Sequence, residues 1–499
     1  MSDPLALLPL ALAAGGGRIG AVGAEPFDAQ QLVAAGLTML QRSAPLVRAL
    51  SGKRSAILLP TAPAYLTALA ASEGRGAVLV NPLASPTEIA YQCRDANVGA
   101  VFTSSALASR LPDGMPFVLL DDAPRTARVV TPDRTQEIDL GSHHGLAIEG
   151  ERDVPGRDEE AVIVYTSAMA GVPLGAVLTH ANMLANARST VEAVANTPDD
   201  DVLALLPYSH LFALTVACGG PLLAGARVRT MDRFHPVRAA ELLPDGITVV
   251  VGVPAVFQAI LSAIERRGVD LHGSALRVCI CGGAVLSVEL QDRWADVTGV
   301  ELRQGYGLTE AAPVCLFNGV DRPNVRGTLG VPFPRVDVAI MPPAEYGPTG
   351  NVAPHRNAER LEDGVPGEIC VRGENVSPGY LHGRADAGLP RRGDWLCTGD
   401  EGVRNADGTF TFLGLLKPMF TRNGFNVYPR EIERVVCELP GVRHAAVSPI
   451  PEPYKENDIA LRVTGPVTEE EVREWCERRL SAYKQPTIVE IEVSERPLK

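Results

Sequence analysis

Short apolar runs alternate with longer segments of helical period along most of the chain. From Ser55 onward, the runs SAILLP, GAVLVNP and AVFTSS end near turn residues, and residues 64–73 and 86–96 between them are predicted helices. A second series follows, with AVIVYTS, VLALLP, ARVRTM, ITVVVGVP and LRVCICGG each read as a strand trailed by a helical segment. Strands that are joined through helices form mainly parallel sheets with helices on their faces. The pattern therefore predicts an α/β fold.

The pattern changes twice toward the C-terminus. After about Gly327, short strands punctuated by Gly, Pro and Asp, such as GEICVRG and DGTFTFLG, predict a small β-rich subdomain. From about Leu415, a helix over 429–439, a strand over 444–450 and an acidic helix over 468–480 predict a small α+β lid. We therefore expect a large N-terminal domain over residues 1–414, with its β-rich subdomain at about 327–414, and a C-terminal lid domain over 415–499.

Composition narrows the class of protein. The 499 residues are 46% apolar, which supports a large core in two or three domains. A net charge of −13 argues against sequence-independent nucleic-acid binding, which needs basic patches. The 9 cysteines form no CxxC pair and no zinc-like spacing with histidine, so we expect reduced thiols and a cytoplasmic protein. The apolar start at residues 4–14 lacks a basic flank and is too short to cross a bilayer, so it predicts an N-terminal helix and no membrane span.

Two segments carry candidate chemistry. After the strand AVIVY, the stretch TSAMAGVPLGAVLTHANM places Gly171 and Gly175 between a buried strand and a helix, where backbone N–H groups can bind phosphates or simply form a turn. The segment QGYGLTE places an aromatic ring, a hydroxyl and a carboxylate close together after a strand. Tyr306 can stack on a base, Thr309 can bind a phosphate and Glu310 can bind Mg²⁺. The alternative for Thr309 is a helix N-cap.

Taken in order, these segments resemble the adenylate-forming acyl-CoA synthetase family, the AMP-binding ligases, over nearly the whole chain. The resemblance is carried by LVNPLASPTEIAYQCRDANVGAVFTS, the loop at residues 165–180, LPYSHLF, CGGAVLS, QGYGLTE, GEICVRGENVSPGYL, WLCTGD, GFNVYPREIE and AYKQP. It implies binding of ATP or AMP, Mg²⁺, a small-molecule carboxylic acid, and the thiol of CoA or of carrier-protein phosphopantetheine. An acyl carrier protein therefore stays open as a partner, and the oligomeric state is not indicated.

The resemblance also implies roles for individual residues. It places Gly282, Gly283 and Tyr306 at the adenine and Asp400 at the ribose. It places Thr309 near the α-phosphate and Glu310 near Mg²⁺ as catalytic residues. The phosphate-loop residues that it implies in cofactor binding are Thr166, Ser167, Gly171 and Gly175.

The remaining implied roles concern the acyl group, the lid and the thiol. His210 borders the carboxylate and acyl pocket, with capping of a helix after Pro207 as the alternative. Lys417 matches the hinge about which the lid rotates between adenylation and thioester formation, and Gly424 matches a glycine beside the pantetheine tunnel. An apolar acyl pocket is suggested by Leu211, Phe212, Ala213, Val253 and Val285.

The sequence departs from the family pattern where the phosphates are expected. The family loop reads close to YTSGTTGxPKG, whereas here Ala168, Met169 and Ala170 replace a glycine and two hydroxyl residues, and Leu174 replaces the lysine. Leu415 stands where the family usually has an arginine for the ribose. The sequence given ends at VSERPLK, before the family's usual C-terminal glycine and lysine, so Lys499 is not assigned the catalytic role. Losing one preorganised charge-stabilising group commonly slows catalysis by about 10²–10³-fold.

Two functions follow from this pattern. The first is an acyl-activating enzyme that converts a carboxylic acid and ATP into an acyl adenylate and then into a thioester, with adenylation impaired or altered. The second is a non-adenylating homologue, either a pseudoenzyme or a protein that binds acyl adenylates or thioesters, which serves a biosynthetic pathway. A separate expectation concerns the nucleotide. Because the base and ribose contacts persist while the cation for the outer phosphates does not, we expect AMP or an acyl adenylate to bind more favourably, relative to ATP, than in ordinary family members.

Overall fold

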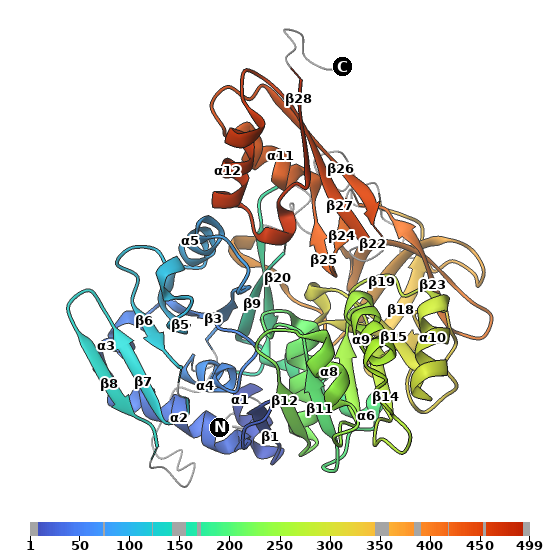
Figure 1. Cartoon of the computed structure of the whole chain (residues 1–499), viewed down its shortest axis with the longest axis horizontal. Helices are drawn as coiled ribbons and strands as arrows, with labels where there is room; N and C mark the ends of the chain where they lie inside the picture. The colour runs from blue at the N-terminus through green and yellow to red at the C-terminus, as the bar shows by residue number, and fades with distance from the viewer. Residues whose placement is uncertain are drawn as a thin grey trace.

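The computed structural model describes residues 8–72, 75–121, 123–141, 156–166, 171–344, 359–383, 391–417, 419–452 and 456–492. Figure 1 shows a large body built from the N-terminal four-fifths of the chain, with the C-terminal part, drawn in orange to red, standing on one side of it. We call this C-terminal part, from β24 at Phe420 to β28 at Glu492, the lid. The predicted α/β fold with a small α+β C-terminal part is confirmed.

One nine-stranded sheet has the order β17-β16-β15-β14-β13-β11-β12-β1-β2. Its strands are β1 Arg18–Ala21, β2 Phe27–Asp28, β11 Asp201–Ala204, β12 Arg227–Thr230, β13 Val249–Gly252, β14 Val278–Cys281, β15 Leu302–Gly307, β16 Val314–Phe317 and β17 Val331–Pro332. The central strands pair in parallel, and β2, β16 and β17 add antiparallel edges. The crossovers between parallel strands are α8 Pro236–Leu242, α9 Pro254–Arg267 and α10 Val288–Thr298.

The second nine-stranded sheet has the order β20-β10-β9-β4-β3-β5-β6-β7-β8. Its strands are β3 Arg54–Leu58, β4 Ala77–Leu79, β5 Val98–Thr103, β6 Phe117–Leu119, β7 Thr126–Val130, β8 Thr135–Asp139, β9 Glu160–Thr166, β10 Leu174–Thr179 and β20 Gly379–Tyr380. The helices on this half are α1 Leu8–Ala14, α2 Ala29–Arg42, α3 Ala44–Leu50, α4 Ala64–Ala71 and α5 Pro86–Asp95. Helix α6 His180–Val194 lies between the two sheets in sequence, and α7 Gly220–Leu223 lies between β11 and β12 of the first sheet.

A five-stranded sheet follows, made of β18 Val336–Met341, β19 Gly367–Gly373, β21 Arg391–Arg392, β22 Trp395–Arg404 and β23 Phe410–Leu415. The lid contains β24 Phe420–Arg422, β25 Phe425–Val427, α11 Pro429–Cys437, β26 His444–Glu452, β27 Glu456–Thr464, α12 Glu469–Arg479, η7 Ala482–Lys484 and β28 Ile488–Glu492. β26, β27 and β28 form a separate sheet.

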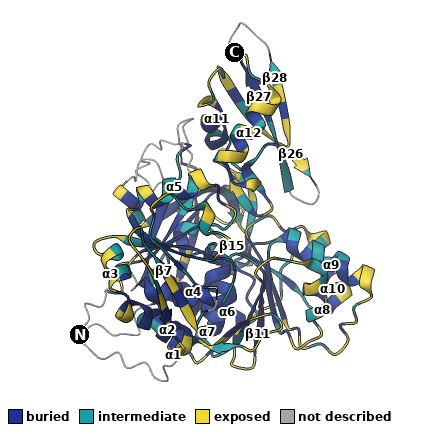
Figure 2. Ribbon diagram, turned by 60° about the vertical axis from the view of Figure 1, so that its left-hand side comes forward, coloured by how far each residue is buried: buried dark blue, intermediate teal, exposed yellow. Residues whose placement is uncertain are grey.

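Buried residues concentrate in the strands and in the helices between the sheets, as the dark blue ribbon of Figure 2 shows. Helix α4 is buried along its whole length, because its sequence AYLTALAA contains no charged residue. The lid has its own apolar cluster, which includes Ile432, Ile459 and Leu461. The large body and the lid therefore each bury a core, and the candidate site must be sought where they meet.

Two sequence expectations, for the segment after β9 and for Val285, need correction. The segment after β9 is not a strand-to-helix turn, because β10 follows it antiparallel and Gly175 pairs with Tyr165 inside that ladder. Val285 is 66% exposed and cannot line a buried acyl pocket. The nine cysteines are free thiols, of which only Cys437 is exposed. Within the described ranges, no helix combines the length and apolar character needed to span a bilayer.

Candidate active site

Three predicted site residues form one chain of polar contacts, in which Asp400 and Lys417 are buried. The hydroxyl of Tyr306, at the end of β15, donates to Asp400 Oδ2 at 2.7 Å. Lys417 Nζ lies 3.1 Å from Asp400 Oδ1 and donates to the carbonyl of Thr398 at 2.8 Å. Burial alone would lower the pKa of Lys417, but the charge of Asp400 raises it, so the amine stays protonated. The structure thus joins the predicted adenine, ribose and hinge residues directly.

A second cluster surrounds Glu310. The hydroxyl of Tyr380, from β20, donates to Glu310 Oε1 at 2.8 Å, and Thr166 Oγ1 lies 3.5 Å from the same oxygen. Thr309 and Glu310 belong to the short turn η4 Thr309–Ala311, whose preceding residue is Leu308, so Thr309 does not act as its N-cap. Sequence reasoning missed Tyr380, although it lies in the family-like segment GEICVRGENVSPGYL.

Two cavities border His210. The larger, of about 570 Å³, lies between the large body and the lid and is lined by Thr166, Ser209, Thr309 and, from the lid, Arg434. The smaller, of about 290 Å³, is mainly apolar and is lined by residues that include Phe212, Val253 and Gly424. His210, Asn81 and Phe425 line both cavities. The imidazole therefore stands where a polar and an apolar compartment approach each other.

His210 also makes a contact near the start of a helix, although Leu211, and not His210, is the N-cap of that helix. Its Nδ1 accepts the backbone N–H of Phe212 at 3.3 Å, at the start of the π-helix η3 Phe212–Gly219. An Nδ1 that accepts places the proton of a neutral imidazole on Nε2. Burial lowers the pKa of His210, which favours this neutral form at pH 7. The contact with Phe212 holds the ring beside both cavities.

Glycine permits a close approach between the lid and the large body at Gly424. This residue has φ +75°, and a Cβ atom placed on it would lie 2.9 Å from Val253 Cγ1. The carbonyl oxygen of Gly424 lies 3.9 Å from the position that a Cβ on Gly283 would take. A Cβ on Gly282 would lie 3.1 Å from both the carbonyl oxygen of Gly305 and the ring of Phe212. Gly283 thus comes near the lid glycine, whereas the nearest neighbours of a Cβ on Gly282 belong to the large body.

The phosphate loop is described only in part. Ser167, Ala168, Met169 and Ala170 lie outside the described residues, as does Lys499. The carbonyl of Gly171 accepts a hydrogen bond from Arg434 Nε of the lid at 2.9 Å. A Cβ on Gly175 would lie 2.9 Å from Leu381 Cδ1, so this glycine allows β10 to pack closely.

Leu174, in the position of the family's lysine, is 3% exposed and pairs with Thr166 across the β9–β10 ladder. Directly paired residues of two strands project from the same face of a sheet. Leu174 therefore presents an apolar side chain on the face that carries Thr166.

Some predicted residues do not share these cavities. Gly282, Gly283, Tyr306 and Asp400 line neither of the two. Of the apolar residues suggested for an acyl pocket, Phe212 and Val253 line the smaller cavity, Leu211 and Ala213 are buried, and Val285 faces solvent. Leu415, at the end of β23, is 41% exposed and pairs with Asp400 in the β22–β23 ladder.

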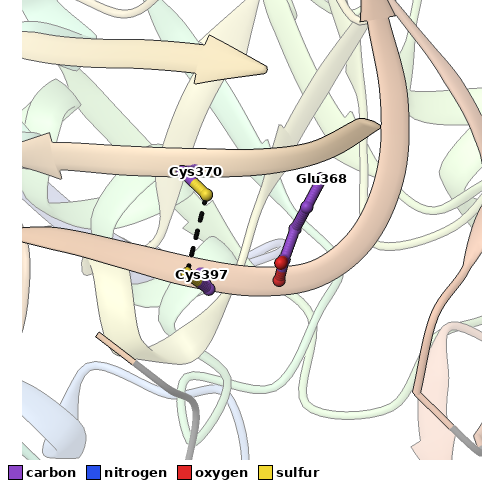
Figure 3. A group of neighbouring side chains, drawn as sticks. All are labelled: Glu368, Cys370 and Cys397. Carbon is purple, nitrogen blue, oxygen red and sulfur yellow. Dashed lines mark hydrogen bonds between the residues drawn. The ribbon is translucent and has the colours of Figure 1, made fainter. Parts of the chain in front are cut away.

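A buried group with metal-ligand chemistry lies in the five-stranded sheet. Glu368, Cys370 and Cys397 place their ligand atoms within 4.8 Å of one another, and Figure 3 shows the two thiols facing across neighbouring strands. The Sγ atoms are 3.6 Å apart. The carboxylate of Glu368, however, already accepts the N–H groups of Ala344 at 2.8 Å and Gly399 at 2.9 Å. Arg392 lies 3.8 Å from it, so the group is satisfied by the protein itself and supports the strand that leads to Asp400.

Comparisons with known proteins identify the family and the fold. The family model for the AMP-binding enzyme matches residues 46–381, and that for the AMP-binding enzyme C-terminal domain matches residues 431–499. The chain is 30% identical over 479 residues to a long-chain-fatty-acid–CoA ligase of Escherichia coli O157:H7, which covers 88% of this chain and 82% of the relative. It is 32% identical over 450 residues to a feruloyl-CoA synthase of Amycolatopsis sp, with 88% and 84% covered. A malonyl-CoA ligase structure with methylmalonyl-CoA and AMP bound is similar in fold, with a TM-score of 0.78, 24% identity and 99% and 100% covered.

Proposed function

The chain belongs to the family of AMP-binding enzymes, and from this premise we propose that it joins a carboxylic acid to the thiol of CoA through an acyl adenylate. In the first half-reaction, the acid's carboxylate attacks the α-phosphorus of ATP, and pyrophosphate leaves. In the second, the thiol attacks the carbonyl carbon, the thioester forms and AMP leaves. The similarity to two relatives that are named as CoA ligases supports CoA as the acceptor.

The observation that carries the proposal is the meeting of two unlike cavities at His210. The larger reaches Thr166 and Thr309, which are the expected phosphate contacts, and the smaller is apolar and reaches Gly424. An acyl phosphate is polar at one end, and a pantetheine arm needs a narrow path without a side chain in it. A reacting carbonyl beside His210 would therefore be open to the phosphate on one side and to the thiol on the other.

The remaining predicted contacts fit a nucleotide in chemical terms. A Cβ on Gly282 would crowd the carbonyl of Gly305 and the ring of Phe212, so glycine keeps this expected adenine segment closely packed. Asp400 would hold the ribose, with Tyr306 and Lys417 fixing its two oxygens. Glu310 offers one carboxylate, and Mg²⁺ bound to nucleotides commonly uses one or two carboxylates together with phosphates and water. When bound, the ion would neutralise phosphate charge, and Tyr380 and Thr166 would orient the carboxylate.

A second candidate function is binding of acyl adenylates or thioesters without adenylation, and Leu174 favours it. The first half-reaction accumulates negative charge on the departing pyrophosphate, which fixed cations must meet. Leu174 supplies none and is buried beside Thr166. The part of the site expected to receive the thiol has lost no such residue, because Gly424 is present and packs closely against Val253. We therefore propose that adenylation is altered while thioester formation is retained.

The test supplies the two half-reactions separately. The protein is incubated with Mg²⁺, ATP, CoA and a panel of acids that includes ferulate and long-chain fatty acids, and acyl-CoA and AMP are measured by mass spectrometry. In parallel, preformed acyl adenylates are offered with CoA or with carrier-protein phosphopantetheine. Thioester from ATP establishes the complete ligase, and thioester from the adenylate alone establishes altered adenylation. Tight binding of an adenylate analogue without turnover supports the binding protein, and the absence of binding and turnover refutes both functions.

A further inference from the structure

Hydrogen bonds join the lid to the N-terminal end of helix α5 of the large body. Ser85 Oγ donates to the carbonyl of Arg479 at 2.8 Å, and Thr87 Oγ1 donates to the carbonyl of Arg478 at 3.2 Å. Figure 1 shows α5 lying next to the lid helix α12, in agreement with these bonds. Both bonds end on backbone carbonyls near the end of α12, and they bring the following residues of the lid against α5.

A buried three-charge cluster lies at the same junction. Lys484 Nζ is 3.0 Å from Glu88 Oε1 and 2.7 Å from Glu431 Oε1. The side chains of Lys484, Glu88 and Glu431 are only 6%, 12% and 4% exposed. Glu88 belongs to α5, whereas the other two belong to the lid, so Lys484 connects the two parts through ion pairs that are largely shielded from water. We call this group the Glu88 cluster.

Contacts within the first turn of α5 fix the position of Glu88 without help from the lid. Its Oε2 accepts the N–H of Ser85 at 2.7 Å, and together these residues form the capping box of α5. Ser481 Oγ of the lid donates to the same oxygen at 2.5 Å. A charge removed from water is stable only when its partner lies at hydrogen-bonding distance. The cluster therefore tolerates little displacement of the lid against α5.

We propose that Glu88 is a positioning residue that, through Lys484, holds the lid in the register at which Gly424 rests against Val253 beside the apolar cavity. The kinetic consequence of this inference rests on the proposed function. A lid released from Glu88 would shift the 423–425 segment that lines the thiol path, whereas Tyr306 and Asp400 belong to the large body and would keep their contact. Loss of Glu88 should therefore slow thioester formation and leave AMP binding intact.

Glu88→Gln is the cleanest variant for the test. Glutamine is as suitable as glutamate in a capping box, and Lys484 keeps its pair with Glu431. The substitution therefore removes the charge of Glu88 and the oxygen that accepts from Lys484, because the glutamine NH₂ group takes that place. We measure CoA-dependent AMP release from a preformed acyl adenylate in single turnover, AMP affinity, and hydrogen exchange of residues 85–95 and 479–484. We expect at least a tenfold slower thiol step, faster exchange in both segments and unchanged AMP affinity. Arg462→Met, which breaks exposed pairs within the lid, is the control and should change none of these.

Lys484→Met gives a second, independent arm. It leaves two buried carboxylates without a cation, so it should impair the thiol step more than Glu88→Gln, and adding Glu88→Gln to it should restore part of the loss. A double variant that is worse than Lys484→Met overturns the proposal, as does unchanged hydrogen exchange in Glu88→Gln. If hydrogen exchange rises in Glu88→Gln while the wild-type protein forms no thioester at all, the proposed function fails and the positioning role stands.

Discussion

Replacement of Gly424 by alanine should slow the second half-reaction selectively. The residue has φ +75°, in the left-handed region where a non-glycine residue costs roughly 1–2 kcal/mol. The added Cβ would lie 2.9 Å from Val253 Cγ1, which is closer than real Cβ atoms approach, and a tight 3.3 Å from Val253 Cβ, so Val253 must shift. This second cost arises only while the lid rests on the large body. We expect it to slow the thiol step about tenfold, equivalent to about 1.4 kcal/mol.

The assay is CoA-dependent release of AMP from a preformed acyl adenylate, measured in single turnover. Gly364→Ala is the matched control, because Gly364 has φ +80° and no atom lies within 4 Å of its added Cβ. Gly364→Ala introduces backbone strain without a clash, so it should lower the stability of the fold and leave the rate of the thiol step unchanged. Val253→Ala removes the contacting methyl groups, so Gly424→Ala in that background should slow the step less than threefold by the same clash argument. The reasoning is refuted if Gly424→Ala behaves like Gly364→Ala, or if Val253→Ala gives no relief.

Three further predictions concern the other parts of the site. Leu174→Lys should raise pyrophosphate–ATP exchange at least about tenfold over Leu174→Met, because it returns a cation beside Thr166; no rise would show that this position does not limit adenylation. Lys417→Met should lower the free energy of unfolding in urea by roughly 3–5 kcal/mol, since it leaves the buried charge of Asp400 without a cation, whereas removing the exposed pair of Arg404 should cost less than about 1 kcal/mol. Burial lowers the pKa of His210 below the ordinary value of 6.5, so below that pH the unfolded chain takes up a proton more readily than the folded protein. The stability that the neutral ring contributes above pH 6.5 is therefore lost on acidification, and His210→Asn should flatten the fall in Tm below that pH.

The sequence predicted the parallel sheets because apolar strands and helices alternate strictly, but it misplaced Gly175. The run LGAVLT leads directly into THANM, and apolar periodicity alone does not mark where one element ends. The missed signal was local. Thr179 and Asn182 cap each other at the start of α6, which places the helix start at His180 and leaves the preceding run free to form β10. A capping pair was therefore a better boundary marker than hydrophobicity.

The candidate site was predictable in its residue types and not in its contacts. The motif QGYGLTE supplied Tyr306 and Glu310, yet their partners Asp400 and Tyr380 lie 94 and 70 residues away. Lys484 and Glu88 are 396 residues apart, and no local pattern links them. Such contacts depend on how the sheets and the lid meet, which follows from packing of the whole chain. The roles of these residues in catalysis stay predictions until the variants are measured.

The two halves of the proposed reaction place different physical demands on this chain, so they can be separated by experiment. The first half needs positive charge where pyrophosphate departs, and Leu174 lies on the large body in that region. The second needs space and register, which Gly424 and Lys484 of the lid determine through Val253 and Glu88. A cation at position 174 cannot correct a displaced lid, and a well-placed lid cannot supply the lost charge. If Leu174→Lys accelerates exchange while Glu88→Gln slows only the thiol step, the altered phosphate loop and the intact acceptor path act independently. If both variants change both steps, the lid and the loop are coupled, and the contact of Arg434 with Gly171 is the connection to test next.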